Sequence, residues 1–162
     1  MAINQAMCGS YKKEITAGIH FWMSHSRTGA SSIAADTFKV AMFTSSRTDA
    51  DQDLTGYTAT NEVTDSGGVY SAGGAALASV TLGLADNSSS VPAAFLDFAD
   101  TTWSSATVTA NGALIYNSST TGGSANRAVV VLAFGGDKTS TAGDFTVSFP
   151  AADASNAIIR IA

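Results

Sequence analysis

The apolar positions near the N-terminus recur at helical spacing, unlike those in the rest of the chain. Between residues 5 and 23 they are three or four positions apart, at Cys8, Tyr11, Ile15, Ile19 and Trp22. This spacing predicts an amphipathic α-helix of about four turns. Gly9 and Gly18 weaken such a helix by about 1 kcal/mol each relative to alanine. Its apolar side therefore needs a partner, which is either the rest of the chain or a neighbouring subunit.

From residue 37 onward the apolar positions alternate or form short unbroken runs, as they do in β-strands. Phe145, Val147 and Phe149 alternate with hydroxyl residues, which is typical of a strand with one buried face. The run 128–134 contains no polar side chain, so we expect a central strand covered on both faces. The same criteria predict further strands at 37–44, 57–63, 77–84, 94–99, 107–117 and 158–161.

Glycine-rich and polar stretches separate these strands. Asn111 and Gly112 suit either a tight hairpin turn or a bulge in one continuous strand, and the bulge is slightly favoured. Residues 135–144 are expected to form a long hairpin loop. About eight short strands without strand–helix alternation predict a mainly β fold. We expect an antiparallel β-sandwich, of jelly-roll or immunoglobulin-like type, with an N-terminal α-helical arm.

The change of pattern also predicts how the chain is divided. Residues 1–35 are expected to form the helical arm and a loop, and residues 36–162 the β-sandwich domain. A chain of 162 residues is long enough to bury a sizeable core without covalent cross-links. The single cysteine, Cys8, excludes an internal disulfide framework.

Charged residues make up only 13% of the chain, against roughly 25% in an average soluble domain. The surface must therefore consist largely of small neutral side chains, which lose little entropy on contact and suit packing against other subunits. The net charge is −5 and the eight lysines and arginines are scattered, so direct binding of nucleic acid is not expected. No apolar run reaches the roughly 20 residues of a membrane-spanning helix, and no signal peptide is recognisable.

Candidate catalytic and metal sites fail on spacing or position. His20 and His25 are five residues apart, which does not place them on one face of a helix. Cys8 and His20 would lie about three turns apart, too far for proton transfer, and His20 is expected to be partly buried or interfacial. The acidic run 49–53 lacks the glycine and the final glutamate of a calcium-binding loop. We therefore expect no catalytic residue, no metal and no cofactor, and predict a non-enzymatic protein.

Several stretches along the chain have a recognisable sequence. They occupy residues 1–8, 36–46, 57–63, 70–74, 98–103, 112–117, 134–138, 149–152 and 158–161. Together they resemble a family of small virion structural proteins of tailed bacteriophages, which is frequent in cyanophages and other aquatic phages. The resemblance spans nearly the whole chain and brings no catalytic residues with it.

The resemblance implies a virion protein that is assembled in the cytoplasm of the bacterial host. The leading expectation is a capsid decoration (cement) protein that binds the major capsid protein or other virion proteins as a homotrimer. A neck or tail adaptor or fibre anchor, forming a six-fold or twelve-fold ring, is the alternative, and a carbohydrate-binding virion domain is a third. The candidate partner-binding side chains are the apolar residues of the arm, Tyr11, Ile15, Ile19, Phe21 and Trp22.

Overall fold

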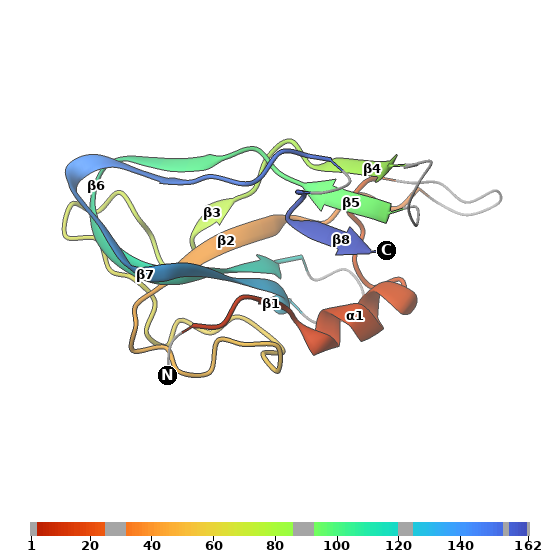
Figure 1. Ribbon diagram of the computed structural model, residues 1–162, viewed down its shortest axis with the longest axis horizontal. Coiled ribbons are helices and arrows are strands. Elements are labelled where there is room, and N and C mark those ends of the chain that lie inside the picture. Colours follow the sequence, from red (N-terminus) through yellow and green to blue (C-terminus); the bar gives the residue numbers. More distant parts are fainter. Residues whose placement is uncertain (1–2, 25–31, 86–92, 120–124, 154–155, 162) are drawn as a thin grey trace. The chain divides into compact units, whose positions relative to one another are not determined.

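The computed structural model describes residues 3–24, 32–85, 93–119, 125–153 and 156–161 (Figure 1). Along the chain the elements are β1 (Ala6–Met7), α1 (Gly9–Thr16), β2 (Phe38–Phe43), β3 (Ala75–Ala76), β4 (Thr81–Ala85), β5 (Ala93–Asp97), β6 (Thr101–Asn117), β7 (Arg127–Val147) and β8 (Ile159–Ile161). The strands form one sheet in the order β1-β7-β6-β2-β3 and another in the order β4-β5-β8. The predicted fold class is confirmed, because the described residues are mainly β, with two antiparallel sheets and one short N-terminal helix.

The chain forms two compact units that do not follow chain order. Unit 1 comprises Met1–Ala76 and Trp103–Phe145, and unit 2 comprises Leu77–Thr102 and Thr146–Ala162. The long strands β6 and β7 contribute to both units. The N-terminal segment adds β1 and α1 to unit 1. The domain boundary that the sequence suggests between residues 35 and 36 stays a prediction.

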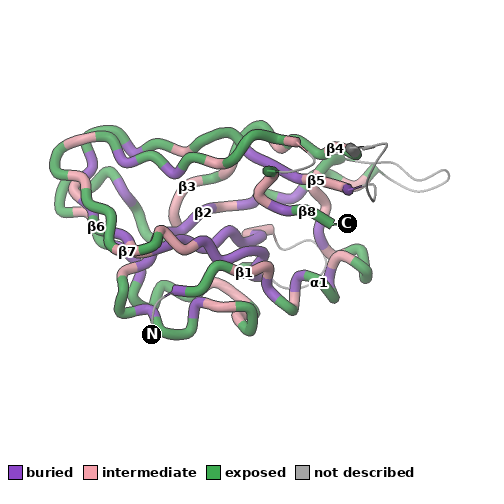
Figure 2. The backbone as a smooth tube through the Cα atoms, viewed as in Figure 1, coloured by how far each residue is buried: buried purple, intermediate pink, exposed green. Residues whose placement is uncertain are grey.

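The core of unit 1 lies along β2, β6 and β7 (Figure 2). Val40 on β2 faces Ile115 on β6 in an antiparallel register, and both side chains are completely buried. The apolar run on β7 is buried from Ala128 to Leu132, which confirms the predicted buried strand over those residues. Strand β1 pairs with the same stretch, where Ala6 lies opposite Val131. The N-terminal segment is therefore part of the sheet.

Unit 2 contains the smaller sheet. Leu82, Leu96 and Ile159 are neighbours across β4, β5 and β8, so they share one face of this sheet. Leu96 and Ile159 are buried, whereas Leu82 lies on the edge strand and is half exposed. Gly83 lies opposite Phe95, and a Cβ atom at Gly83 would overlap the aromatic ring. Phe95 therefore packs across Gly83, and its ring would have to move if residue 83 had a side chain.

The N-terminal helix is shorter than the sequence pattern predicts. It spans eight residues, Gly9–Thr16, rather than residues 5–23. Gly18 ends it, because φ is +67° there and the two following bonds close a Schellman motif. In that motif the Gly18 N–H donates to the Ile15 carbonyl at 3.2 Å and the Ile19 N–H donates to the Glu14 carbonyl at 3.1 Å. Residues 6–7 form strand β1 and are not part of the helix.

Three strand predictions have different outcomes. The predicted strand at 57–63 is wrong, since only isolated bridges at Gly56 and Glu62 are present there. The continuous strand at 107–117 is confirmed, because β6 runs through Asn111 and Gly112 without a turn. The predicted hairpin loop at 135–144 is wrong, because β7 continues to Val147. Cross-strand bonds hold this part of β7, including Thr109 to Thr139 at 2.9 Å.

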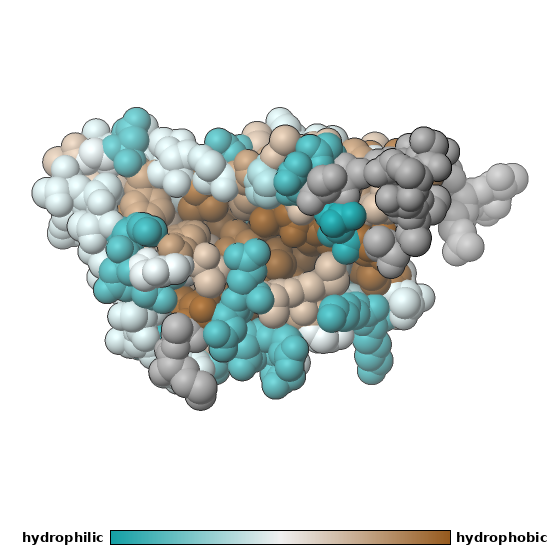
Figure 3. Space-filling view, viewed as in Figure 1, coloured by the Kyte–Doolittle hydropathy of each residue, from teal (hydrophilic) through white to brown (hydrophobic). Residues whose placement is uncertain are grey.

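The exposed surface along β6 and β7 consists mainly of hydroxyl and small residues. The exposed positions include Ser104, Ser105, Thr109, Thr139, Thr141 and Ala142. Figure 3 shows strongly hydrophilic side chains in separate groups on the face in view, with neutral and hydrophobic side chains between them. The sparse charge seen in the composition therefore corresponds to a largely neutral surface on these strands.

Two glycines with the same backbone conformation provide a test of packing in unit 1. Gly74 and Gly68 have φ of +66° and +74°, but only at Gly74 would a Cβ atom overlap backbone, at the Val40 carbonyl oxygen. We expect Gly68→Ala to lower the free energy of unfolding by about 1 kcal/mol, from backbone strain alone. We expect Gly74→Ala to lower it by about 3 kcal/mol, because β2 must move as well. Urea unfolding of the two variants measures this difference, and equal losses would contradict the packing described.

Candidate functional site

The N-terminal arm is attached to unit 1 by a buried carboxylate. Glu14 lies on α1, and the Schellman turn after the helix returns the chain so that His20 lies beside it. Glu14 Oε2 is 2.7 Å from His20 Nε2, and Glu14 Oε1 accepts a hydrogen bond from Arg127 Nη1 at 2.6 Å. One side chain thus joins the arm to the beginning of β7.

A second layer of polar groups lies behind His20. Asn117 Nδ2 is 3.1 Å from His20 Nδ1 and also donates to Asp36 Oδ2 at 2.8 Å. Asp36 Oδ2 accepts a further bond from the Phe21 N–H at 2.9 Å, while Asp36 Oδ1 has no hydrogen-bond partner among the described residues. We name the set Glu14, His20, Asp36, Asn117 and Arg127 the arm anchor.

The arm anchor fixes the protonation state of His20. Because the Asn117 amide nitrogen can only donate, His20 Nδ1 must be the acceptor, and the ring proton lies on Nε2 and is donated to Glu14. Burial lowers the pKa of His20 below its ordinary value of 6.5, although Glu14 acts in the opposite direction. His20 is therefore neutral near pH 7. The expectation that it is partly buried or interfacial is confirmed, since it is 8% exposed.

Aromatic rings pack around the arm anchor. The rings of Tyr11 and His20 meet edge to face with centroids 5.0 Å apart, and those of Trp22 and Phe38 stack at 3.5 Å. Tyr11 is 2% exposed, and burial raises its pKa to about 12. Of the two partners left open for the apolar side of the helix, the rest of the chain provides these contacts.

The five candidate partner-binding residues therefore differ in how much surface they expose to a partner. Tyr11 is buried in its own unit, and Trp22 is half-buried against Phe38. Ile15, Ile19 and Phe21 are also half-buried, and Ile19 lines a cleft described below. Contact with a partner stays a prediction for the four residues that keep exposed surface.

The arm anchor is suited to holding the arm in place rather than to moving protons. Both ring nitrogens of His20 are already engaged, so neither can accept a proton from a substrate without breaking a bond. Burial raises the pKa of the Cys8 thiol to about 12, which keeps it protonated and weakly nucleophilic. Among the described residues, no group of three or more His, Cys, Asp or Glu side chains is placed to hold a metal ion. His25 lies outside the described residues.

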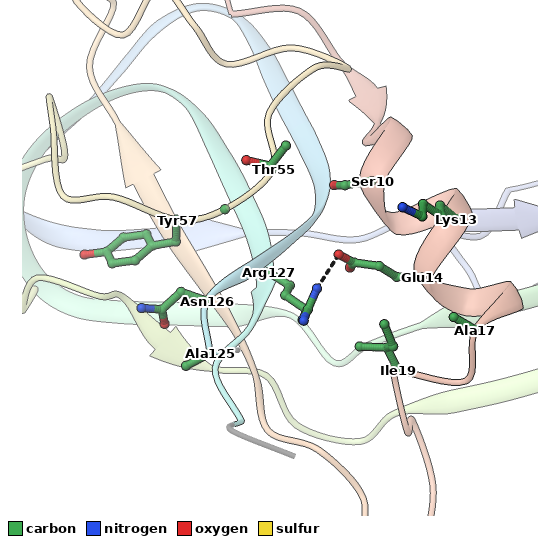
Figure 4. Close-up of a pocket in the computed structure, with 11 residues that line it drawn as sticks. Ser10, Lys13, Glu14, Ala17, Ile19, Thr55, Tyr57, Ala125, Asn126 and Arg127 are labelled. Atoms are coloured by element: carbon green, nitrogen blue, oxygen red, sulfur yellow. Dashed lines mark hydrogen bonds and ion pairs between the residues drawn. The ribbon is translucent and has the colours of Figure 1, made fainter. Parts of the chain in front are cut away.

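A cleft of about 550 Å³ opens beside the arm anchor (Figure 4). Helix α1 supplies one wall, the segment around Thr55 another, and the start of β7 a third. Its polar side chains are Ser10, Lys13, Glu14, Thr55, Tyr57, Asn126 and Arg127. In Figure 4 the Glu14–Arg127 pair crosses the space between α1 and β7. The cleft and the arm anchor thus share two charged side chains.

Apart from His20, sequence patterns did not identify the residues of the arm anchor. Glu14 occupies the polar side of the predicted helix but is 8% exposed in the structure. Its partner Arg127 is 113 positions away, and Asn117 is 97 positions from His20. Residues that are so far apart in the sequence leave no local spacing pattern that would predict their pairing.

No helix in the described parts of the chain is both long and apolar enough to span a membrane. Comparisons with protein-family models, with curated proteins and with solved structures found no match to this chain.

The lowered pKa of His20 makes stability depend on pH. The unfolded chain binds a proton at His20 as the pH falls through 6.5, whereas the folded chain takes it up only at lower pH. We expect the free energy of unfolding to decrease as the pH falls from about 7.5 to about 5.5. His20→Gln keeps a donor for Glu14 and an acceptor for Asn117 without titrating, so its decrease should be smaller. Urea unfolding of both proteins at both pH values measures these decreases in the free energy of unfolding. An equal decrease in the variant and in the unmodified protein would contradict a buried neutral His20.

Proposed function

We propose that this chain is a non-enzymatic structural protein of a tailed-bacteriophage particle and acts as a capsid decoration protein. In this role it binds the outer surface of the assembled shell and stabilises it. The sequence resemblance suggests the class of protein. The observation that carries the proposal is an exposed apolar row on one face of the small sheet of unit 2, with members on β4 and β8.

Strands β4 and β8 present this row. Five large hydrophobic side chains among the described residues are exposed, and three of them belong to the small sheet: Leu82 at 51%, Leu84 at 72% and Ile161 at 48%. Leu82 and Leu84 are two residues apart on β4 and share one face, and the strand register places Ile161 on that face as well. Apolar side chains gathered in this way are typical of a contact surface.

The edge of β4 is also open to pairing. Among the described strands β4 pairs only with β5, so its outer backbone groups face away from the sheet. Edge strands are usually protected by lysine, proline or a bulge, and residues 81–85 contain neither lysine nor proline. An edge that lacks lysine and proline and carries exposed leucines favours docking against another subunit, either a capsid protein or a second copy of this chain.

The neutral surface of β6 and β7 supports the same role. Its hydroxyl groups are held by cross-strand hydrogen bonds such as Thr109 to Thr139, so little side-chain freedom is lost on contact. A protein that binds only the assembled shell stabilises it by mass action, and contacts repeated by symmetry add avidity to weak single sites. A homotrimer bound to the major capsid protein would use both effects.

Paired substitutions test this proposal. Leu84→Asp places a charge in the apolar row, whereas Val69→Asp makes the same change at an exposed hydrophobic residue of unit 1. We expect Leu84→Asp to weaken binding of the purified protein to stripped phage heads at least about tenfold, because burying an unpaired charge is unfavourable. Val69→Asp should bind as the unmodified protein does. Co-sedimentation with the heads measures binding, and circular dichroism verifies folding. Full binding by folded Leu84→Asp would contradict the role of β4.

A further inference from the structure

We infer that the cleft beside the arm anchor binds an acidic saccharide, a sugar ring that carries a carboxylate as well as hydroxyl groups. This inference goes beyond the decoration role, because it concerns unit 1 alone and a small ligand rather than the capsid shell. It rests on the size of the cleft, the balance of its charges and the hydrogen-bonding groups along its walls.

The size and polarity of the cleft suit a small polar ligand. Its volume of about 550 Å³ falls within the range of ligand sites, roughly 300–1,000 Å³. Seven of the side chains that line it carry hydroxyl, amide or charged groups, and Ile19 is the one large aliphatic side chain among them. An apolar ligand would remove these polar groups from water without replacing their hydrogen bonds, which is unfavourable.

The charges of the cleft favour an anion. Lys13 and Arg127 bring two positive charges and Glu14 one negative charge, so the cleft is positive in a chain whose net charge is −5. The carboxylate of Glu14 already pairs with Arg127. Lys13 forms no ion pair with any described residue, so its ammonium group is the natural partner for a carboxylate on the ligand.

The carboxylate of Glu14 also requires hydrogen-bond donors on the ligand. Each of its oxygens accepts one hydrogen bond, from His20 or from Arg127, and retains a lone pair for a second donor. A simple anion has no donor to offer and would be repelled by this carboxylate. Sugar hydroxyl groups are donors as well as acceptors, so they can bond to Glu14 and to the Ser10 and Thr55 hydroxyls. A carboxylate-bearing sugar meets both requirements.

The arm anchor prepares these groups before a ligand arrives. Glu14 is fixed from two sides, and its side chain is only 11% exposed. Because little side-chain freedom is lost when the ligand binds, even a weak set of hydrogen bonds contributes to affinity.

Two neighbouring lysines allow a matched test. Lys13 lines the cleft, whereas Lys12 is exposed on the same helix and does not line it. We expect the full chain to bind trigalacturonate saturably, in a titration followed by amide chemical shifts of Ser10, Ala125 and Asn126. Lys13→Gln should weaken this binding at least about tenfold, and Lys12→Gln by less than about twofold. A neutral galactose trisaccharide and an acetylated triglutamate peptide should each bind much more weakly than trigalacturonate.

The outcomes that overturn the inference are distinct. Absence of saturable binding to trigalacturonate, or binding without shifts at the cleft residues, would reject the site. Equal losses of affinity in the two lysine variants would show that binding depends only on the overall charge of the chain and not on the cleft. Equal binding of the neutral trisaccharide would remove the need for a carboxylate, and equal binding of triglutamate would remove the need for hydroxyl groups. None of these results bears on binding of the chain to phage heads, which is measured separately.

Discussion

The position of the N-terminal arm depends on the carboxylate of Glu14. Helix α1 has eight residues and β1 has two, so neither is long enough to be stable alone in water. Strand β1 is held by its pairing with β7, whereas Glu14 joins α1 to β7 through Arg127 and to His20 in the segment after the helix. Asn117 and Asp36 complete the hydrogen bonds behind His20. Removing Glu14 would leave the buried Nε2–H of His20 without its acceptor, which costs more than the bond itself contributes. The aromatic packing and the cleft both follow from this attachment.

A second buried carboxylate organises the irregular segment of unit 1. Glu62 accepts hydrogen bonds from the Tyr57 hydroxyl at 2.6 Å, the Tyr70 hydroxyl at 2.7 Å and the Gly73 N–H at 2.8 Å. The Tyr70 hydroxyl accepts in turn from the Met42 N–H on β2 at 2.8 Å. Residues between β2 and β3 are thus held by side chains where a sheet ladder is absent. Glu14 accepts from two side-chain donors, and Glu62 accepts from two hydroxyls and one backbone N–H, so both carboxylates satisfy donors outside the sheet ladders.

The contacts of these two carboxylates could not be predicted from the sequence. Hydrophobic runs predicted β2 and the buried part of β7, because strand formation there follows the burial of consecutive apolar residues. The strand expected at 57–63 failed because Tyr57 and Glu62 bond to each other instead of alternating across a ladder. The loop expected at 135–144 failed because Gly135 and Gly136 looked like a turn, whereas paired side chains such as Asn111 and Asp137 keep β7 beside β6. The arm anchor had no local signal, since its members come from four separate segments of the chain.

The proposed role in a phage particle combines the neutral surface, the open edge of β4 and a firmly attached arm. The most direct measurement is the number of copies of the chain in each purified particle, obtained by quantitative mass spectrometry against the major capsid protein. A decoration protein that occupies repeated positions on the shell predicts on the order of hundreds of copies. Roughly six or twelve copies, as a ring in the neck or tail requires, would contradict the decoration role. Absence of the chain from the particles would contradict a virion protein altogether.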